Sequence, residues 1–350
     1  MLSDLRVLDV PLGKHACASC GLVKRPSGVR ERLFESGYRL YDHAPGAVGE
    51  SARQSVYAEW LSVQGLGQRR SILDLGCGNG SLLLALRRWW PGAALRGLDP
   101  SHESVGRARD AGVDARCGRV GEVPLEPADL VVSVNVVEHV EDPVTFLQSM
   151  AALVSPDGSL LLACPDGGRA WLELLFVDHL WSFSAAHLGQ LASHAGLKVV
   201  DWTAAPVALG SFQLVRLSRE AANGPAAIPA PGADALIGAK DRYLRAWGSL
   251  EQDLLARAGD ARSLACFGAG EAAALLRAYA PEVWRRVAVC LVDAPEEATF
   301  GDVPVIDCVH RRGVDDPVLL GVRPEGQPAV AQRLLGAGCS VIRWDDRIAA

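Results

Sequence analysis

Three glycines at alternate positions separate a short apolar run from a helical pattern in the stretch ILDLGCGNGSLL, residues 72–83. Glycine loses more backbone freedom on folding than other residues, so Gly76, Gly78 and Gly80 indicate a turn that something approaches closely. Asp74 stands two residues before the first glycine, at the end of the expected strand. Ligands of open α/β sheets bind outside the carboxyl ends of the strands, so we expect a ligand at this turn.

Short apolar runs alternate with helical segments from residue 71 onward. Runs of four to six residues separated by helices are typical of a parallel sheet covered on both faces. After a helix expected near residues 184–195, KVVDWTAA and GSFQLVRLS follow each other closely and predict an antiparallel pair at the sheet edge. The expected fold class is α/β, with a mostly parallel sheet that ends in this antiparallel edge pair.

Composition along the chain predicts four segments. Residues 1–60 lack a regular pattern, and residues 61–221 carry the expected sheet. Residues 222–234 (ANGPAAIPAPGAD) are rich in Ala, Pro and Gly, which is typical of a linker. Residues 235–350 continue with strands and helices and predict a second, smaller α/β domain.

Charge and cysteine usage argue against several classes of protein. The net charge is −6 with no block of Lys or Arg, so we expect no nucleic-acid partner. No run of 18 apolar residues occurs, and the first residues lack the pattern of a secretory signal, so we expect no membrane span. The nine scattered cysteines indicate mostly reduced, buried thiols, and we expect a cytoplasmic protein.

A second acidic residue identifies the kind of ligand. Asp99 stands about 19 residues beyond Gly80, at the end of the next expected strand. An acidic group at that point can accept two hydrogen bonds from ribose hydroxyls. The glycine spacing is G-x-G-x-G rather than the G-x-G-x-x-G of dinucleotide sites, which disfavours a nicotinamide oxidoreductase.

LDLGCGNG, residues 73–80, resembles motif I of class I S-adenosylmethionine (SAM) methyltransferases. DLVVSVNVVEHVEDP resembles the fourth strand and following loop of these enzymes, and GRVGEVP resembles their adenine-side loop. The resemblance implies a class I methyltransferase Rossmann-like sheet and SAM as cofactor, with Asp74 facing its ammonium group. The cofactor-binding residues implied are Asp74, Gly76, Cys77, Gly78, Asn79, Gly80, Asp99, Pro100, Val120 and Asn135.

ELLFVDHLWSFSAAHL, residues 173–188, resembles the EHxSYFS segment of nucleotide-sugar C-methyltransferases. In that family a Glu-His pair lies at the active site and the histidine is the proposed base. The matching residues are Asp178 and His179, and Asp is one methylene shorter than Glu. LFESGYRLYDHAPG resembles a tyrosine-bearing segment, which implies that Tyr41 steadies an enolate oxygen. His139, in EHVEDP, either lines the substrate cleft or caps local backbone.

HACASCGLVKRPSG resembles the second half of the N-terminal zinc module of the same family. A structural zinc ion takes four ligands, and Cys17 and Cys20 supply two. The family's first cysteine pair has no counterpart, so the segment is interpreted as a remnant of the module. Either His15 or His43 completes a zinc site, or the segment is free of metal with two reduced thiols. The sequence leaves both alternatives open.

These resemblances imply a SAM-dependent methyltransferase that acts on a small-molecule acceptor. The family implies C-methylation of a nucleotide-linked keto-deoxysugar in antibiotic or other natural-product biosynthesis, with His179 as the base and the C-terminal domain taking part in substrate binding. The same histidine also suits an O- or N-methyltransferase of another natural product or of a surface glycan. A non-catalytic protein that binds SAM or a nucleotide is a further alternative, and the oligomeric state stays open.

Overall fold

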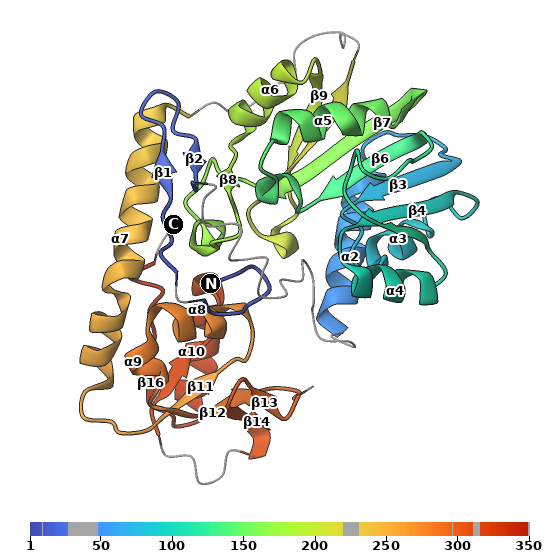
Figure 1. Ribbon diagram of the computed structural model, residues 1–350. Coiled ribbons are helices and arrows are strands. Elements are labelled where there is room, and N and C mark those ends of the chain that lie inside the picture. Colours follow the sequence, from blue (N-terminus) through green and yellow to red (C-terminus); the bar gives the residue numbers. More distant parts are fainter. Residues whose placement is uncertain (9, 27–47, 220–230, 296, 311–315, 349–350) are drawn as a thin grey trace. The chain divides into compact units, whose positions relative to one another are not determined.

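The computed structural model of the 350-residue chain describes residues 1–8, 10–26, 48–219, 231–295, 297–310 and 316–348 (Figure 1). The chain forms two compact units. The larger unit comprises Leu12–Ile237, and the smaller unit joins Met1–Pro11 to Gly238–Ala350.

The larger unit is built on a sheet whose described strands follow the order β5-β4-β3-β6-β7-β10-β9. The strands are β3 (Ser71–Leu75), β4 (Ala94–Asp99), β5 (Asp114–Cys117), β6 (Ala128–Val134), β7 (Val154–Pro165), β9 (Lys198–Ala204) and β10 (Phe212–Ser218). Strands β3 to β7 are parallel, and β10 runs antiparallel to both β7 and β9. The predicted α/β sheet with its antiparallel edge pair is therefore confirmed.

Helices cover both faces of this sheet (Figure 1). They are α2 (Val48–Ser62), α3 (Ser81–Leu86), α4 (His102–Asp110), α5 (Pro143–Ala152) and α6 (Ala185–His194). Successive strand residues point to opposite faces, so Ile72 joins the core under α2, α3 and α4. Its neighbour Leu73 joins the core under α5 and α6. Burial on both faces explains why these strands are nearly continuous apolar runs.

Helix α2 departs from the expectation that residues 1–60 are irregular. Its Tyr57, Trp60 and Leu61 are buried, and this i, i+3, i+4 spacing places them on one helix face. The Trp60 indole Nε1 donates a hydrogen bond to Thr203 Oγ1 at 3.1 Å. The predicted boundary between residues 60 and 61 thus falls inside a helix that is part of the sheet core. Among the side chains of α2 that the structure describes, the buried ones lie between Tyr57 and Leu61, and mostly polar or small residues precede them in the sequence and hide the pattern.

A small antiparallel sheet links the N-terminal segment to the loop that carries His179. Its strands are β1 (His15–Ala16), β2 (Val23–Lys24) and β8 (Trp181–Ser182), in the order β1-β2-β8. Just beyond β2, the Arg25 N–H donates to the Leu180 carbonyl at 2.8 Å. The N-terminal hairpin therefore holds the backbone beside His179.

The smaller unit contains a second sheet of order β13-β14-β12-β11-β15-β16. Its elements are α7 (Ala233–Ala258), β11 (Leu264–Phe267), α8 (Glu271–Tyr279), α9 (Pro281–Trp284), β12 (Val287–Val292), β13 (Thr299–Phe300), β14 (Val303–Asp307), β15 (Val318–Leu320), α10 (Gln327–Gly336) and β16 (Val341–Ile342). All pairs are parallel except β13 with β14. The expected further α/β domain is present.

The start of α7 at Ala233 shortens the linker predicted over residues 222–234, whose residues 222–230 lie outside the described part. Within the described residues, no helix combines the length and the apolar character needed to cross a bilayer.

We predict that Gly76→Ala destabilises the larger unit by about 3 kcal/mol, since it combines a left-handed backbone with overpacking. Gly76 has φ of +89°, and an added Cβ would lie 2.2 Å from Val136 Cγ2. The matched control is Gly106→Ala in the middle of α4, where nothing lies within 4 Å of an added Cβ. The control should be stabilised by about 0.5–1 kcal/mol through helix propensity. Urea unfolding measures both variants, and equal stabilities would contradict the strain assigned to Gly76.

Candidate functional site

A pocket open to solvent lies at the carboxyl ends of β3 and β6. The chain proceeds from β3 outward to β4 and β5, then returns to place β6 on the other side of β3. The pocket therefore lies where the strand order reverses, which is the usual ligand site of an open α/β sheet. Its lining consists of Gln54, Asp74, Gly76, Cys77, Gly78, Asn79, Leu82, Val134 and Asn135. The structure brings most of the predicted cofactor residues together here.

The glycine turn connects β3 to α3 with its backbone exposed to the pocket. Gly80 has φ of +81°, and an added Cβ would lie 3.0 Å from Val113 Cγ2. A glycine at this position therefore allows the turn to pack closely against Val113. Asn79 Oδ1 accepts hydrogen bonds from the Ser81 N–H at 3.1 Å and the Ser81 hydroxyl at 2.6 Å. The Cys77 side chain is buried against Gly97, where an added Cβ would lie 2.5 Å from its Sγ. Burial raises the pKa of the Cys77 thiol, which keeps it protonated.

Asp99 ties the end of β4 to the glycine turn. Its Oδ2 accepts the Gly78 N–H at 2.9 Å, and its Oδ1 accepts the Ser101 N–H at 2.8 Å. Burial raises the pKa of the Asp99 carboxyl, and the two N–H donors oppose that effect. Each carboxylate oxygen has a second lone pair, so both remain able to accept from ribose hydroxyls. Pro100 follows on the surface, and its carbonyl accepts a weak hydrogen bond from Cys117 Sγ at 3.4 Å.

Asp74 is buried in the pocket wall with one oxygen unsatisfied. Its side chain is 2% exposed, and Oδ1 has no hydrogen-bond partner. Burial, followed by the nearby Asp99 charge, raises the pKa of Asp74 from 3.8 to about 8. Gln54 Oε1, in the same lining, also has no partner. A buried acceptor without a donor costs about 1–3 kcal/mol, so a ligand with a donor group, above all a cationic one, would bind favourably here.

Asn135 places a polar side chain in the lining of the same pocket. Its φ of +59° is left-handed, a region that asparagine tolerates better than most residues. Its Nδ2 lies 3.3 Å from the hydroxyl of Tyr57 on α2. Burial raises the pKa of Tyr57, so this phenol stays protonated. The sequence offered no signal for Gln54 or Tyr57 because the helix that carries both was not expected. Val120, the remaining predicted cofactor residue, lies half-buried against the core under α5 and α6.

A second cluster of titratable side chains contains both predicted catalytic histidines. His139 ends the 3₁₀ helix η2 (Val137–His139), and His179 lies in the loop before β8. Their ring centroids are 4.8 Å apart and their planes are nearly perpendicular, at 86°. Burial is the largest cause that lowers the pKa of His139 to about 4, and the neighbouring His179 adds to it. His139 is therefore neutral at physiological pH.

The carboxylates face these histidines in an arrangement that the sequence did not predict. Asp178 Oδ2 lies 3.6 Å from His139 Nδ1, and the Asp178 carbonyl lies 3.0 Å from the same nitrogen. Glu173 Oε2 lies 3.8 Å from His179 Nδ1, and the Ser182 hydroxyl donates to the other Glu173 oxygen. Glu173 belongs to the 3₁₀ helix η3 (Leu172–Leu175). The carboxylate that faces His179 is thus Glu173, which was not among the predicted site residues.

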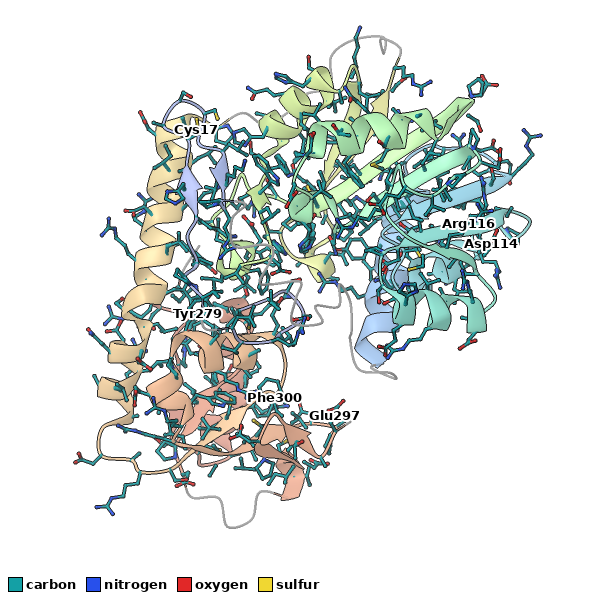
Figure 2. All side chains as sticks on the ribbon, viewed as in Figure 1. Cys17, Asp114, Arg116, Tyr279, Glu297 and Phe300 are labelled. Carbon is teal, nitrogen blue, oxygen red and sulfur yellow. The ribbon has the colours of Figure 1, made fainter. Side chains whose placement is uncertain are left out.

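The structure describes the predicted zinc ligands Cys17 and Cys20 but not the predicted tyrosine. Tyr41 and His43 lie outside the described residues. Cys17 is exposed at the end of β1 (Figure 2), and its pKa is lowered to about 7, chiefly by a hydrogen bond with the Ser19 side chain. Among the described residues, the group with three potential metal ligands in reach of one another is Glu138, His139 and His179. The described part of the chain supplies no such third ligand to Cys17 and Cys20, so zinc at this pair stays a prediction.

Comparisons with known proteins concern the same part of the chain. Residues 50–201 match the model of a family described as a methyltransferase domain. The chain is 46% identical over 82 residues to a trans-aconitate 2-methyltransferase of Mycolicibacterium gilvum (strain PYR-GCK), covering 23% of this chain and 32% of that protein. It is 34% identical over 125 residues to a ubiquinone biosynthesis O-methyltransferase of Bradyrhizobium diazoefficiens, covering 34% and 48%. The chain spans about a third to a half of the length of these curated relatives.

Solved structures give slight likenesses. TnmH has a TM-score of 0.44 at 24% identity, over 56% of this chain and 64% of its own. The mitomycin 7-O-methyltransferase MmcR has a TM-score of 0.43 at 21% identity, over 49% of this chain and 54% of its own.

The part of the chain that matches the methyltransferase-domain model, residues 50–201, contains the parallel strands β3 to β7 and the pocket at their carboxyl ends. SAM is the cofactor that fits the pocket at the switch point. The unpartnered Oδ1 of Asp74 suits the charged methionine end of SAM, and the neighbouring Asp99 suits its ribose.

We predict that the Asp74 carboxyl makes stability depend on pH. Its folded-state pKa of about 8 exceeds the ordinary value of 3.8, so it stabilises the fold when protonated. This contribution is complete below about pH 4 and is lost as the pH rises to about 8. Asp74→Asn has no such proton, so its urea midpoint should rise relative to wild type between pH 5 and pH 8 and then level off. A difference that does not change with pH would show that the carboxyl is ionised throughout.

Proposed function

We propose that the chain is a SAM-dependent methyltransferase that acts on a small-molecule acceptor. The observation that carries the proposal is the unsatisfied Oδ1 of buried Asp74, which lies in the pocket lining beside the glycine turn. Asp74 would hold the ammonium of SAM, the backbone of the turn its methionine chain, and Asp99 its ribose. Bound there, SAM supplies an activated methyl group.

The positive charge of the cofactor and the ionised form of Asp74 stabilise each other. An adjacent cation stabilises an ionised carboxylate, so a bound ammonium would lower the pKa of Asp74 from about 8. The carboxyl is then neutral in the empty pocket and ionised in the filled one. A buried carboxyl of this kind selects a ligand whose positive charge replaces the missing hydrogen bond.

The histidine cluster supplies the proton chemistry that an acceptor requires. We assign His179 as the general base, because a neutral imidazole removes protons effectively near physiological pH. Glu173, 3.8 Å from His179 Nδ1, would orient the ring and stabilise the charge it gains. Ser182 positions Glu173 through its hydroxyl. His139, neutral and held by Asp178, would line the acceptor side, and Tyr41 remains a candidate donor to the acceptor oxygen.

For the acceptor we propose a nucleotide-linked keto-deoxysugar methylated at carbon. Support comes from the DHLWSFS segment and from the buried base, since a carbon next to a ketone must lose a proton before it becomes a nucleophile. A second candidate, O-methylation, is supported by the named O-methyltransferase that shares 34% identity over 125 residues. Both candidates use the same histidine.

We predict that S-adenosylhomocysteine binds the chain and that Asp99→Asn weakens this binding about tenfold, since one charge-assisted hydrogen bond contributes about 1.5–3 kcal/mol. Asp110→Asn, at the exposed end of α4, is the matched control and should bind like wild type. Isothermal titration calorimetry measures all three proteins. Unchanged affinity in Asp99→Asn would remove the ribose role, and no binding to wild type would remove the proposed function.

We predict that the enzyme in D₂O exchanges deuterium into the carbon next to the ketone of a keto-sugar nucleotide. Exchange should fall at least about 100-fold in His179→Ala, because general bases contribute roughly 10²–10⁴ in rate. His194→Ala removes an exposed histidine on α6 and should exchange normally. NMR follows the loss of the proton signal. Methylation of an oxygen without any exchange would favour the O-methyltransferase instead.

A further inference from the structure

Three potential metal ligands meet in the interior of the larger unit. Glu138, His139 and His179 each offer one ligand atom, and these atoms lie within 4.8 Å of one another. All three side chains are buried, with at most 7% exposed. Two come from η2, which begins two residues after the pocket residue Asn135, and the third comes from the loop before β8. The fold thus brings together residues about 40 positions apart.

Two atoms of this trio have no partner although they are shielded from water. Glu138 Oε2 and His179 Nδ1 are fully buried and receive or donate no hydrogen bond. Burying a polar group without a partner costs several kcal/mol, and an ionised carboxylate costs more. The carboxylate oxygen and the imidazole nitrogen can each donate a lone pair. A metal cation bound between them would accept both lone pairs and so satisfy both atoms.

We propose that Glu138, His139 and His179 bind a divalent transition-metal ion, with Zn²⁺ as the representative case. Two imidazoles and one carboxylate are a ligand set that suits Zn²⁺, Co²⁺ and related ions rather than Mg²⁺ or Ca²⁺, which prefer oxygen alone. Three protein ligands leave a position open for water or for an acceptor oxygen.

The surroundings of His139 match those of a metal-bound histidine. Such a ligand commonly donates its second ring N–H to a carboxylate or a backbone carbonyl, which orients the ring. His139 Nδ1 lies 3.0 Å from the Asp178 carbonyl and 3.6 Å from the Asp178 carboxylate. This leaves Nε2 as the metal ligand, and Nε2 lies 3.9 Å from Glu138 Oε1. Asp178 would therefore act as the positioning residue of the metal site.

The geometry requires only a small closure. Neighbouring ligands at roughly 2.1 Å from one tetrahedral ion are about 3.4 Å apart, so the present spread of 4.8 Å must close by about 1.4 Å, which side-chain shifts of under about 1 Å on each side supply. The local charge also favours a cation, because three buried carboxylates, Glu138, Glu173 and Asp178, surround two histidines. Among the residues that the structure describes, Arg25 and Lys14 are cations whose charges act on Asp178 and His139.

The metal site does not depend on the proposed methyl transfer. If both hold, His179 binds the ion instead of acting as a free base, the ion would polarise the acceptor oxygen as a Lewis acid, and the Glu173 carboxylate beside His179 would take the proton. The deuterium exchange predicted above would then require the metal.

Cobalt binding tests the site in the full chain after treatment with a chelator. The double variant Cys17→Ser/Cys20→Ser provides the background, so that thiolate ligands cannot contribute. We expect one Co²⁺ per chain, with visible absorption of nitrogen and oxygen ligation and no thiolate-to-cobalt band. Glu138→Gln and His179→Gln should each weaken cobalt binding by roughly 100-fold or more. A residue that only hydrogen-bonds to a metal ligand already contributes about 10–100-fold to affinity, and a ligand itself contributes more.

Asp178→Asn removes the carboxylate 3.6 Å from His139 Nδ1 but keeps the backbone carbonyl 3.0 Å from it, so cobalt binding should weaken by no more than about tenfold while the visible spectrum keeps its shape. Exposed residues give matched controls, and His102→Gln and Glu126→Gln should bind cobalt normally. Binding of S-adenosylhomocysteine by each variant, measured separately, shows that the domain is folded and that the cofactor pocket is intact. Absence of stoichiometric cobalt in the background protein would overturn the proposal even where cofactor binding persists. Cobalt affinity in Glu138→Gln and His179→Gln equal to that of the background protein would overturn it as well.

Discussion

A buried carboxyl group at the end of a central parallel strand determines much of the surrounding architecture. Asp74 has one oxygen without a donor, and its pKa is raised to about 8 by burial and by Asp99. The glycine turn next to it exposes backbone to the same pocket, and Asp99 holds that turn by accepting the Gly78 N–H. A positively charged ligand with a ribose would satisfy these groups together, as the proposed function requires.

The second cluster shows how loops bring distant titratable side chains together. η2, η3 and the segment before β8 place two histidines and three carboxylates in one buried region. β2 pairs with β8, so the N-terminal hairpin fixes the backbone on which His179 lies. The hairpin thereby contributes to the site whether or not Cys17 and Cys20 bind zinc.

The sequence predicted features that depend on local spacing, and it failed where partners are distant. Alternation of apolar runs was enough for the parallel sheet and for the β9–β10 edge pair, because burial on both faces imposes that pattern. Helix α2 was missed because mostly polar or small residues precede its buried residues in the sequence, and Gln54 and Tyr57 were missed with it. Asp178 was expected beside His179, but three separate segments decide which carboxylate faces which ring, and Glu173 takes that place. Spacing along the chain carries no information on such a choice.

The central claim is that the switch-point pocket holds the cofactor through Asp74 and Asp99. A crystal structure of the chain with S-adenosylhomocysteine tests it most directly. The account predicts the ligand amino group within hydrogen-bond distance of Asp74 Oδ1, and the ribose hydroxyls on Asp99. A ligand bound elsewhere, or one whose amino group avoids Asp74, would contradict it.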